Sequence, residues 1–507
     1  MVVRLSCGAL QGVDAFRVDL EVDFVRQGLP SFVMVGLAEG AVREAKERVF
    51  AALRSCNFRL PPSRITVNLA PADRRKAGSG YDLPLAVGLL AAAGLVPEER
   101  LRGWFLMGEL SLGGTIKPVP GVLPLAVLAR EEGAKGMLVA PENAPEAAVA
   151  GVRAYGPQTL GEAVSLLMGE TDLDPAPVPE LLAGRKEEPD FADVKGQEQA
   201  KRAIEIAAAG AHNLLFFGPP GSGKTMLAQR IPSILPPLSF PEALEVTKIY
   251  SVAGLLEEGG LMSGRPFRAP HHTVSDRALV GGGTFPRPGE VSLAHRGVLF
   301  LDELPEFGRA TLDALRQPLE NGVVTISRTS QAVTFPADCM LVAAMNPCPC
   351  GYATDPTHVC ICSPQQIQRY RSRISGPLLD RIDLHVAVPP VPYDELRASV
   401  PAESSAQIRQ RVVAARERQS RRYADTRCRT NADLSGRLLE EHCRLDSQGQ
   451  DFLREAVRRL ALSARAYTRI LRLARTIADL ADSGDIGVEH LAEAVACRAL
   501  DRGRDGI

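Results

Sequence analysis

The stretch NLLFFGPPGSGKTMLAQRI, residues 213–231, decides the fold of this chain. Its apolar start predicts a buried strand, and a glycine-rich turn leads from that strand into a helix. Such a turn aims backbone N–H groups at phosphate oxygens, and the helix N-terminus behind it adds positive potential. We expect Lys224 to reach the outer phosphates of ATP and the Thr225 hydroxyl to bind Mg²⁺. The predicted nucleotide-binding residues are Gly218, Pro219, Pro220, Gly221, Ser222, Gly223, Lys224 and Thr225.

Two acids follow a second apolar segment, GVLFLDEL at residues 297–304. We expect Asp302 to hold the Mg²⁺ and Glu303 to polarise the attacking water. An Asp-Glu pair at the end of a strand is common in proteins, so its meaning depends on the phosphate-binding loop upstream. A third apolar segment ends in Asn346, which suits a side chain that orients the water; the alternative is an asparagine that caps a turn before Pro347.

Phosphoryl transfer also requires arginines that neutralise charge on the phosphates. The segment SGPLLDRIDLH contains Arg381, and a downstream helical segment, SARAYTRILRLARTIADL, contains Arg465. In a ring-shaped ATPase we expect Arg381 to act on the neighbouring subunit's nucleotide and Arg465 to act on the nucleotide of its own subunit. Arg373 and Arg469 are the respective alternatives.

Four cysteines cluster in CPCGYATDPTHVCIC, at Cys348, Cys350, Cys360 and Cys362. Four thiolates can enclose one tetrahedral Zn²⁺, so we predict a structural zinc site. The one-residue spacers are tighter than the usual two to four, and the alternative is a set of reduced cysteines around a functional loop. His358 is a substitute ligand.

A hairpin is predicted over residues 321–335, NGVVTISRTSQAVTF, with Arg328 at or near its tip. We expect Arg328 to contact a DNA backbone, against the alternative of a plain surface arginine. His271 and His272 lack a nearby acid cluster in the sequence, so we assign them to a loop and not to a metal. Between residues 409 and 429 eight arginines outnumber two acids, which indicates either a solvated helix face or a phosphate contact.

Length, composition and charge are those of an ordinary globular protein. At 507 residues the chain exceeds one hydrophobic core, and about 150 residues per domain predicts about three domains. Its 59 basic and 60 acidic residues give a net charge of -1, so the overall charge gives no hint of a nucleic-acid partner. We find neither a secretory signal nor a stretch of ~18 apolar residues, so we expect a cytoplasmic protein without a membrane partner. Its ten cysteines should then stay reduced.

The predicted fold class is α/β, in four regions. Residues 1–168 are predicted to form an α/β domain in which YDLPLAVGLLAAAGL is a buried helix. Residues 169–190 are rich in proline and acids and are the predicted linker. Residues 191–395 carry the nucleotide motifs and are predicted to form an α/β core with a parallel sheet. Residues 396–507 have a helical period and are the predicted α-helical lid.

These motifs make the chain resemble the magnesium-chelatase-like AAA+ ATPases of the ComM/YifB type over nearly its whole length. The resemblance is carried by RITVNLAPADRRKAGSGYDLPLAVGLLAA, DVKGQEQAKRAIEIAAAGAHNLLFFGPPGSGKTMLA, LFLDELPEF, NPCPCGY and SGPLLDRIDLHV. It implies an N-terminal Lon-protease-like (ribosomal S5 domain 2-like) domain, a chelatase-like ATPase module and a C-terminal helical lid. It further implies a homohexameric DNA helicase that promotes branch migration during natural transformation.

A Lon-like fold raises the alternative of a protease, which needs a nucleophilic serine and a lysine. The serine position of that fold holds Asp82-Leu83-Pro84 here, so only a displaced dyad from Ser79 with Lys76 or Lys117 remains. We therefore expect assembly or DNA handling from this domain. Two further alternatives are a magnesium chelatase motor subunit, and an ATP-gated scaffold or remodelling partner of other proteins.

Overall fold

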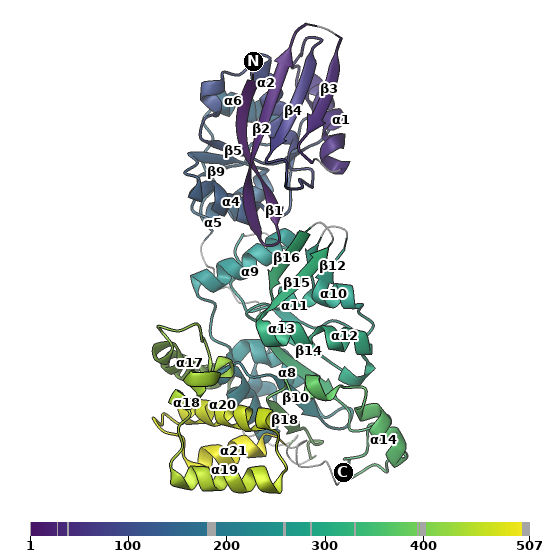
Figure 1. Ribbon diagram of the computed structural model, residues 1–507, viewed down its shortest axis with the longest axis vertical. Coiled ribbons are helices and arrows are strands. Elements are labelled where there is room, and N and C mark those ends of the chain that lie inside the picture. The colour runs from purple at the N-terminus through teal and green to yellow at the C-terminus, as the bar shows by residue number, and fades with distance from the viewer. Residues whose placement is uncertain are drawn as a thin grey trace.

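The computed structural model arranges the chain in three parts stacked along one axis, with the N-terminal domain at one end (Figure 1). The nucleotide-motif core lies in the middle, and the helical C-terminal region packs beside its far end. Residues 180–188 of the predicted linker lie outside the described residues. The residues described are 2–27, 29–37, 40–179, 189–256, 260–283, 286–328, 331–392, 395 and 402–498.

A seven-stranded mixed sheet forms the N-terminal domain. Its order is β3 (Ser31–Val35), β4 (Arg64–Ala70), β2 (Asp14–Val25), β1 (Val2–Gln11), β5 (Trp104–Leu106), β8 (Gly136–Leu138) and β9 (Ala154–Tyr155). β1 and β2 form a long antiparallel hairpin because Gly12, at φ 68°, turns the chain. Alternate residues of β2, among them Leu20 and Val22, are buried, so one face of the sheet carries the core.

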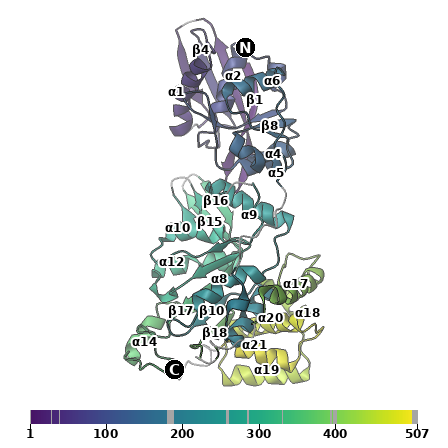
Figure 2. The same ribbon diagram turned by 180° about the vertical axis from the view of Figure 1, so that it is seen from behind.

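Helices cover that face, as Figures 1 and 2 show from opposite sides. The main ones are α1 (Gly40–Ser55), α2 (Asp82–Ala92), α4 (Val122–Glu131) and α6 (Leu160–Met168). Every residue of α2 is buried, and α2 packs between the β1–β2 hairpin and α1. The predicted buried helix is therefore confirmed. Shorter elements complete the domain: α3 (Glu98–Leu101), β6 (Glu109–Leu110), β7 (Ile116–Lys117) and α5 (Ala144–Val149).

Structural contacts occupy the residues that a protease dyad would need. Asp82 is fully buried and accepts a hydrogen bond of 2.6 Å from Arg48 Nε. Lys76 is fully buried and donates to backbone carbonyl oxygens, while the Ser79 hydroxyl donates to Glu109. Ser79 and Lys76 thus bond to different partners, so the structure does not support the protease alternative.

A five-stranded parallel sheet forms the core of the second domain. Its order is β11 (Phe267–Arg268), β14 (Val298–Leu301), β17 (Met340–Met345), β10 (Leu214–Phe217) and β18 (Leu384–Ala387). Leu214 and Phe216 face one hydrophobic cluster and Leu215 faces another, so the sheet is buried on both faces. The predicted α/β class with a parallel core sheet is confirmed. Because the strands are parallel, their carboxyl ends share one edge.

Helices sandwich this sheet. α7 (Glu198–Gly210) and α8 (Lys224–Ile234) contribute to the cluster on one face. The elements that contribute to the cluster on the other face include α10 (Asp276–Val280), α11 (Glu290–Leu293), α12 (Arg309–Ala314), α13 (Arg316–Asn321), α14 (Pro364–Arg371) and α15 (Gly376–Leu379). Because helices cover both faces of the sheet, a ligand can reach it only at the ends of the strands, and ligands of such sheets bind outside the carboxyl ends.

The predicted hairpin is formed by β15 (Val323–Arg328) and β16 (Gln331–Pro336). Beside it lie a small ribbon, β12 (Gly281–Gly282) with β13 (Arg287–Pro288), and helix α9 (Phe240–Ala253). Arg328 ends β15, but its side chain lies outside the described part of the structure. The tip of the β1–β2 hairpin reaches this region, because Val13 shares a hydrophobic cluster with Val333 of β16 and Val246 of α9.

The C-terminal region is helical, as expected. It comprises α17 (Ser405–Arg422), α18 (Gly436–His442), α19 (Ser447–Arg459), α20 (Ala464–Leu480) and α21 (Val488–Ala496). Several arginines between residues 409 and 429 contact this chain itself. Arg416 donates to Ala208 O at 2.8 Å, and Arg422 pairs with the buried carboxylate of Asp479. These arginines hold the lid to the core and to itself, which neither of the two sequence alternatives anticipated.

Candidate nucleotide site

The phosphate-binding loop runs from the carboxyl end of β10 to the N-terminus of α8. Gly221 and Gly223 adopt φ values of 75° and 93°, which L side chains rarely tolerate. A Cβ atom on Gly218 would lie 2.1 Å from Val388 O, so this position accepts glycine alone. The glycines of the motif are thus required by backbone conformation and by close packing.

Lys224 is buried at the centre of this loop. Its Nζ donates to Gly218 O and Pro219 O at 2.8 Å each, and to Asn346 Oδ1 at 3.2 Å. Burial lowers the pKa of Lys224, while the charges of Asp302 and Glu303 act in the opposite direction. The cation is therefore held by neutral oxygen atoms of the loop, in a place where phosphate oxygens would be stronger partners.

The loop also holds a buried polar atom without a partner. Among the described residues, Ser222 Oγ is buried and accepts or donates no hydrogen bond. A buried hydroxyl without a partner in this loop is free to bond to a ligand atom such as a phosphate oxygen. Together with the buried cation of Lys224, it fits a loop that closes around the phosphates of a nucleotide.

A hydroxyl and a carboxylate meet beside the loop. Thr225 Oγ1 donates to Asp302 Oδ2 at 2.6 Å, across the gap between α8 and the end of β14. Both oxygens are hard ligands of the kind that Mg²⁺ uses together with substrate phosphates. The residues present therefore fit a magnesium ion at this position.

Glu303 has an unusual backbone. Its φ of 52° lies in the left-handed region, and its N–H donates to Asp302 Oδ1 at 2.9 Å. Strain of this kind in a residue other than glycine is typical of functional sites. The Glu303 side chain is 54% exposed, so its carboxylate faces the open edge of the sheet.

His272 contacts that carboxylate, which the sequence did not predict. Its Nδ1 lies 3.3 Å from Glu303 Oε2, and its ring lies against His271 and the edge of Phe307. The contact arises because β11 and β14 are adjacent and parallel, so that the segments following them meet. Only a correct strand order could have revealed this pair from the sequence.

Gln197 is a second residue that the sequence did not single out. It has a φ of 60° just before α7, and its Nε2 donates to Ser222 O at 3.3 Å and to Pro389 O at 2.6 Å. It thereby connects the phosphate-binding loop to the segment after β18. The quoted motif DVKGQEQA contains it, but nothing in its spacing indicates this contact.

Arg381 lies at the opposite edge of the sheet from Lys224. It precedes β18, and its carbonyl oxygen accepts a hydrogen bond of 3.0 Å from Asn213, the residue before β10. Its guanidinium pairs with Glu320 of α13 and donates to Pro377 O at 2.7 Å. Since Lys224 follows the other end of β10, Arg381 does not reach the nucleotide site of its own chain.

Arg465 also lies near this opposite edge. Its Nη1 is 3.4 Å from Asp380 Oδ2, next to Arg381 in the chain. The structure thus brings Arg465 together with Arg381 and does not bring it to Lys224, where an action within one subunit would require it. Of the alternatives, Arg469 pairs with Asp383 at 2.7 Å on the same side.

Arg373 lies elsewhere, beside the segment that follows Glu303. Its Nη1 is 2.7 Å from Glu306 Oε2 and 3.3 Å from Pro305 O. Arg373 is therefore near the nucleotide edge of its own chain.

The four cysteines converge as predicted from their clustering. Their ligand atoms all lie within 4.8 Å of one another. The Sγ atom of Cys360 is 3.7 Å from that of Cys348 and 3.6 Å from that of Cys350. Four thiolates at about 2.3 Å from one tetrahedral Zn²⁺ would be about 3.8 Å apart, so this arrangement fits the metal. Gly351 within the loop faces Pro220 of the phosphate-binding loop, where an added Cβ would come within 2.7 Å.

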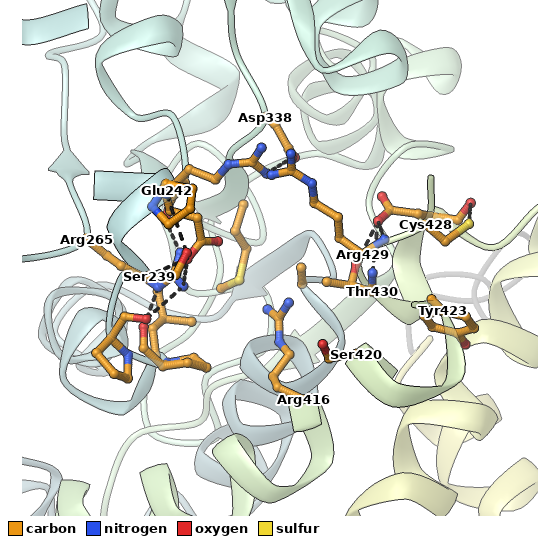
Figure 3. Close-up of a pocket in the computed structure, with 18 of the residues that line it drawn as sticks. Ser239, Glu242, Arg265, Asp338, Arg416, Ser420, Tyr423, Cys428, Arg429 and Thr430 are labelled. Carbon is orange, nitrogen blue, oxygen red and sulfur yellow. Dashed lines mark hydrogen bonds and ion pairs between the residues drawn. The ribbon is translucent and has the colours of Figure 1, made fainter. Parts of the chain in front are cut away.

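A cavity of about 720 Å³ lies at the amino ends of the core strands, between core and lid (Figure 3). Gly297 and Met340, at the amino ends of β14 and β17, line it, so it is distinct from the nucleotide site. Arg416 of α17 and Arg265 of the core both contribute to it. Burial and the nearby charge of Arg265 lower the pKa of Arg416 to about 10.

Three family profiles match consecutive parts of the chain. The profile "Subunit ChlI of Mg-chelatase" matches residues 20–143. The profile "Magnesium chelatase, subunit ChlI" matches residues 190–396, and that of the ChlI C-terminal region matches residues 402–498. Among the described residues, no helix has both the length and the apolar character needed to cross a membrane.

Individual proteins are similar over nearly the full length. The chain is 47% identical to competence protein ComM of Haemophilus influenzae over 97% of both chains. It is 46% identical to the uncharacterized protein YifB of Escherichia coli, over 97% of this chain and 96% of that protein. A magnesium-chelatase 67 kDa subunit of Chlorobaculum parvum is 29% identical, over only 31% of this chain.

Proposed function

Because this chain belongs to the ComM/YifB family of magnesium-chelatase ChlI-like AAA+ ATPases, we propose that it is a DNA motor driven by ATP hydrolysis. In this proposal it forms a homohexameric ring and acts as a helicase that promotes branch migration. The DNA part of the proposal rests on the resemblance to the ComM type and on the similarity to a protein named for competence.

The observation that carries the ATPase proposal is the meeting of three strand ends at one edge. Lys224 follows β10, Asp302 follows β14 and Asn346 follows β17, and direct hydrogen bonds connect Lys224 to Asn346 and Asp302 to Thr225. Backbone N–H groups and Lys224 bind the phosphates in this proposal. Thr225 and Asp302 hold Mg²⁺, which neutralises charge on the phosphate oxygens.

Glu303 and Asn346 are the proposed water-positioning pair. The Glu303 carboxylate accepts the proton of the attacking water, and the Asn346 amide orients that water toward the terminal phosphorus. In the structure Asn346 Oδ1 is bound to Lys224 and Glu303 Oε2 is near His272. Both side chains must therefore exchange these partners for the water when hydrolysis begins.

The position of Arg381 supports the proposal of a ring. It lies at the amino ends of the core strands, away from Lys224 of its own chain, which suits an arginine that acts on the next subunit's nucleotide. Arg465 contacts Asp380, next to Arg381 in the chain, so in this proposal both arginines act on the neighbour's nucleotide and not, as expected from the sequence, one on each side. Both guanidinium groups pair with carboxylates of their own chain, Arg381 with Glu320 and Arg465 with Asp380, so in the ring they would exchange these partners for the neighbour's phosphates. A subunit alone would then bind ATP but hydrolyse it poorly.

The hairpin and the cysteine loop complete the proposal. The β15–β16 hairpin, with Arg328 at its end, contacts the DNA backbone. The four cysteines hold one structural Zn²⁺, which fixes the loop after Asn346 against the phosphate-binding loop. Hydrolysis at the carboxyl ends of the core strands would then move this separate two-stranded hairpin.

The test is the ATPase rate and the oligomeric mass, each measured with and without forked or four-way-junction DNA, with Lys224→Ala as the inactive control. We expect a ring whose hydrolysis is strongly stimulated by DNA and abolished in the variant. Hydrolysis that ignores every DNA offered would contradict the motor on DNA. That result would leave an ATPase that acts on proteins or on a tetrapyrrole.

A further inference from the structure

A groove in the N-terminal domain combines aromatic rings with positive charge. It lies between the edge strand β3, helix α1 and the loop that follows α1, and it has a volume of about 720 Å³. Three phenylalanines and three basic side chains line it, and none of the described lining residues is acidic. The six are Phe32, Lys46, Phe50, Arg54, Phe58 and Arg59.

The aromatic side chains are half-buried, so each presents part of its ring to the groove. Phe32 and Phe50 meet edge to face, with ring centroids 5.9 Å apart and an angle of 82° between the rings. This packing fixes their orientation. Pro61 and Pro62 also line the groove and stiffen the loop that carries Phe58.

The basic side chains are not neutralised by strong partners. Arg54 and Arg59 are exposed, and within the described ranges neither forms an ion pair. Lys46 lies 5.8 Å from the centre of the Phe32 ring, and its contact with Glu47, at 3.7 Å, is an exposed surface pair of little strength. A chain with a net charge of -1 therefore gathers three cations around one aromatic groove.

We propose that this groove binds single-stranded DNA. Unstacked bases pack against the phenylalanine rings, and Arg54 and Arg59 contact the adjacent phosphates. Bases offer a π face whatever their identity, so rings with flanking cations bind a single strand without reading its sequence. A duplex keeps its bases stacked and fits such a groove poorly. The inference rests on the proposed action on DNA and names a second contact for the strand.

The location suits a strand that has already been separated. In Figure 1, α1 and β3 lie near the end of the molecule that is farthest from the lid, with the rest of the N-terminal domain between them and the core. A strand in the groove therefore does not compete with nucleotide at Lys224. It would keep one product strand away from the partner it has just left.

The experiment measures binding of a fluorescein-labelled oligothymidylate to the full-length protein with a non-hydrolysable ATP analogue. The variants are Arg54→Glu with Arg59→Glu, and Phe58→Ala alone. Arg102→Glu is the matched control, because Arg102 is exposed in the same domain but lies outside the groove. Thermal melting and hexamer mass are recorded for each, and free thymidine monophosphate is tested as a competitor.

We expect the double arginine variant to weaken binding at least about tenfold. The slope of log K against log salt concentration should fall by about 0.7 for each phosphate that the variant no longer neutralises. Phe58→Ala should weaken binding about 5- to 150-fold. The control and the ATPase rate without DNA should match wild type.

Four results would overturn the inference. If wild type binds the oligonucleotide and the variants bind equally well, the groove is not a DNA site and the motor proposal stands. If the variants lose hexamer mass, the groove receives a neighbouring subunit instead. If wild type binds no DNA at all, both proposals fail. Displacement by the free mononucleotide as effectively as by the oligonucleotide would assign the groove to a nucleotide and not to a strand.

Discussion

At the scale of single residues, Lys224, Thr225 and Glu303 of the site each already contact another group of this chain. Lys224 is held by two carbonyl oxygens, and Thr225 by Asp302. Glu303 is strained at φ 52° and lies beside His272. The chemistry proposed here therefore requires exchange of partners, with each new bond replacing an old one.

His272 gives the sharpest test at this scale. If its contact keeps the Glu303 carboxylate turned away from the water, His272→Ala should raise the ATPase rate without DNA about fivefold, the effect of an interaction of about 1 kcal/mol. Steady-state rates with and without DNA measure this. His271→Ala is the control, because the His271 ring lies against His272 but no contact with Glu303 is described for it. A loss of activity in His272→Ala would instead show that the histidine orients the base.

Most of these residues could be predicted from the sequence, because the chemistry of a phosphate-binding loop fixes types and order along the chain. Lys224, Thr225, Asp302 and Asn346 lie together as expected. His272 and Gln197 could not be predicted, since their contacts depend on which strands are neighbours.

At the scale of elements, the loop between β17 and α14 connects the cysteines to the nucleotide edge. Gly351 faces Pro220, and Cys348 is buried just after Asn346. A change in the cysteine loop therefore acts on the phosphate-binding loop directly.

We expect one Zn²⁺ per chain in protein purified without chelators. Its removal, or Cys360→Ser, should lower the melting temperature and the ATPase rate together, because the loop then loses its cross-link beside Pro220. Elemental analysis and thermal melting measure this. Cys56→Ser is the control, since Cys56 is in the N-terminal domain and outside the cluster. Metal-free protein with full activity would refute the zinc site.

An ion pair joins the core to the lid: Asp383, just before β18, pairs with Arg469 of α20. Burial alone would raise the pKa of Asp383, but hydrogen bonding to His212 and the charge of Arg469 outweigh it and hold this pKa well below its usual range. A carboxyl group with a lowered folded-state pKa stabilises the fold above its unfolded pKa of about 3.9 and loses that contribution as the pH falls further.

Asp383→Asn should therefore destabilise the protein by about 3–5 kcal/mol at neutral pH, because it leaves Arg469 buried without its partner. It should also flatten the fall of the melting temperature between about pH 5 and pH 3. Melting curves across this range compare the variant with wild type. Parallel curves for the two proteins would contradict the role of this ion pair. Asp380→Asn, at an exposed pair with Arg465, is the control and should change little.

Some of these elements could be predicted from the sequence, and their arrangement could not. The buried α2, the parallel core sheet and the β15–β16 hairpin all follow from local pattern. The order β11-β14-β17-β10-β18 does not, because pairing between distant strands leaves no local signal. For the same reason the arginines of α17 suggested solvent or DNA, while the fold uses them against Ala208 and Asp479.

At the scale of the whole molecule, Lys224 lies at the carboxyl ends of the core strands and Arg381 at their amino ends. In the proposed closed ring, Arg381 and Arg465 of one subunit would lie beside Lys224 of the next subunit. This arrangement makes a prediction that single-subunit chemistry does not make.

Lys224→Ala, Arg381→Ala and Arg465→Ala should each lose activity, in the range of about 10³- to 10⁵-fold for the arginine that stabilises the transition state. Mixing Lys224→Ala subunits with either arginine variant should restore activity, because some interfaces then hold an intact nucleotide site and both arginines. Mixing Arg381→Ala with Arg465→Ala should restore nothing. ATPase rates of mixed rings measure this, and recovery in that last mixture would place Arg465 in its own subunit's site.

The bonds that Lys224 makes with Gly218 O and Pro219 O have a consequence for the timing of the cycle. The ammonium group of Lys224 has hydrogen-bond partners in its own loop. When a product leaves, this buried charge would therefore not be left without a partner. Vacant subunits can then persist beside loaded ones. In the proposed ring, the sites would then not have to fill all at once, and the subunits could hydrolyse ATP in turn.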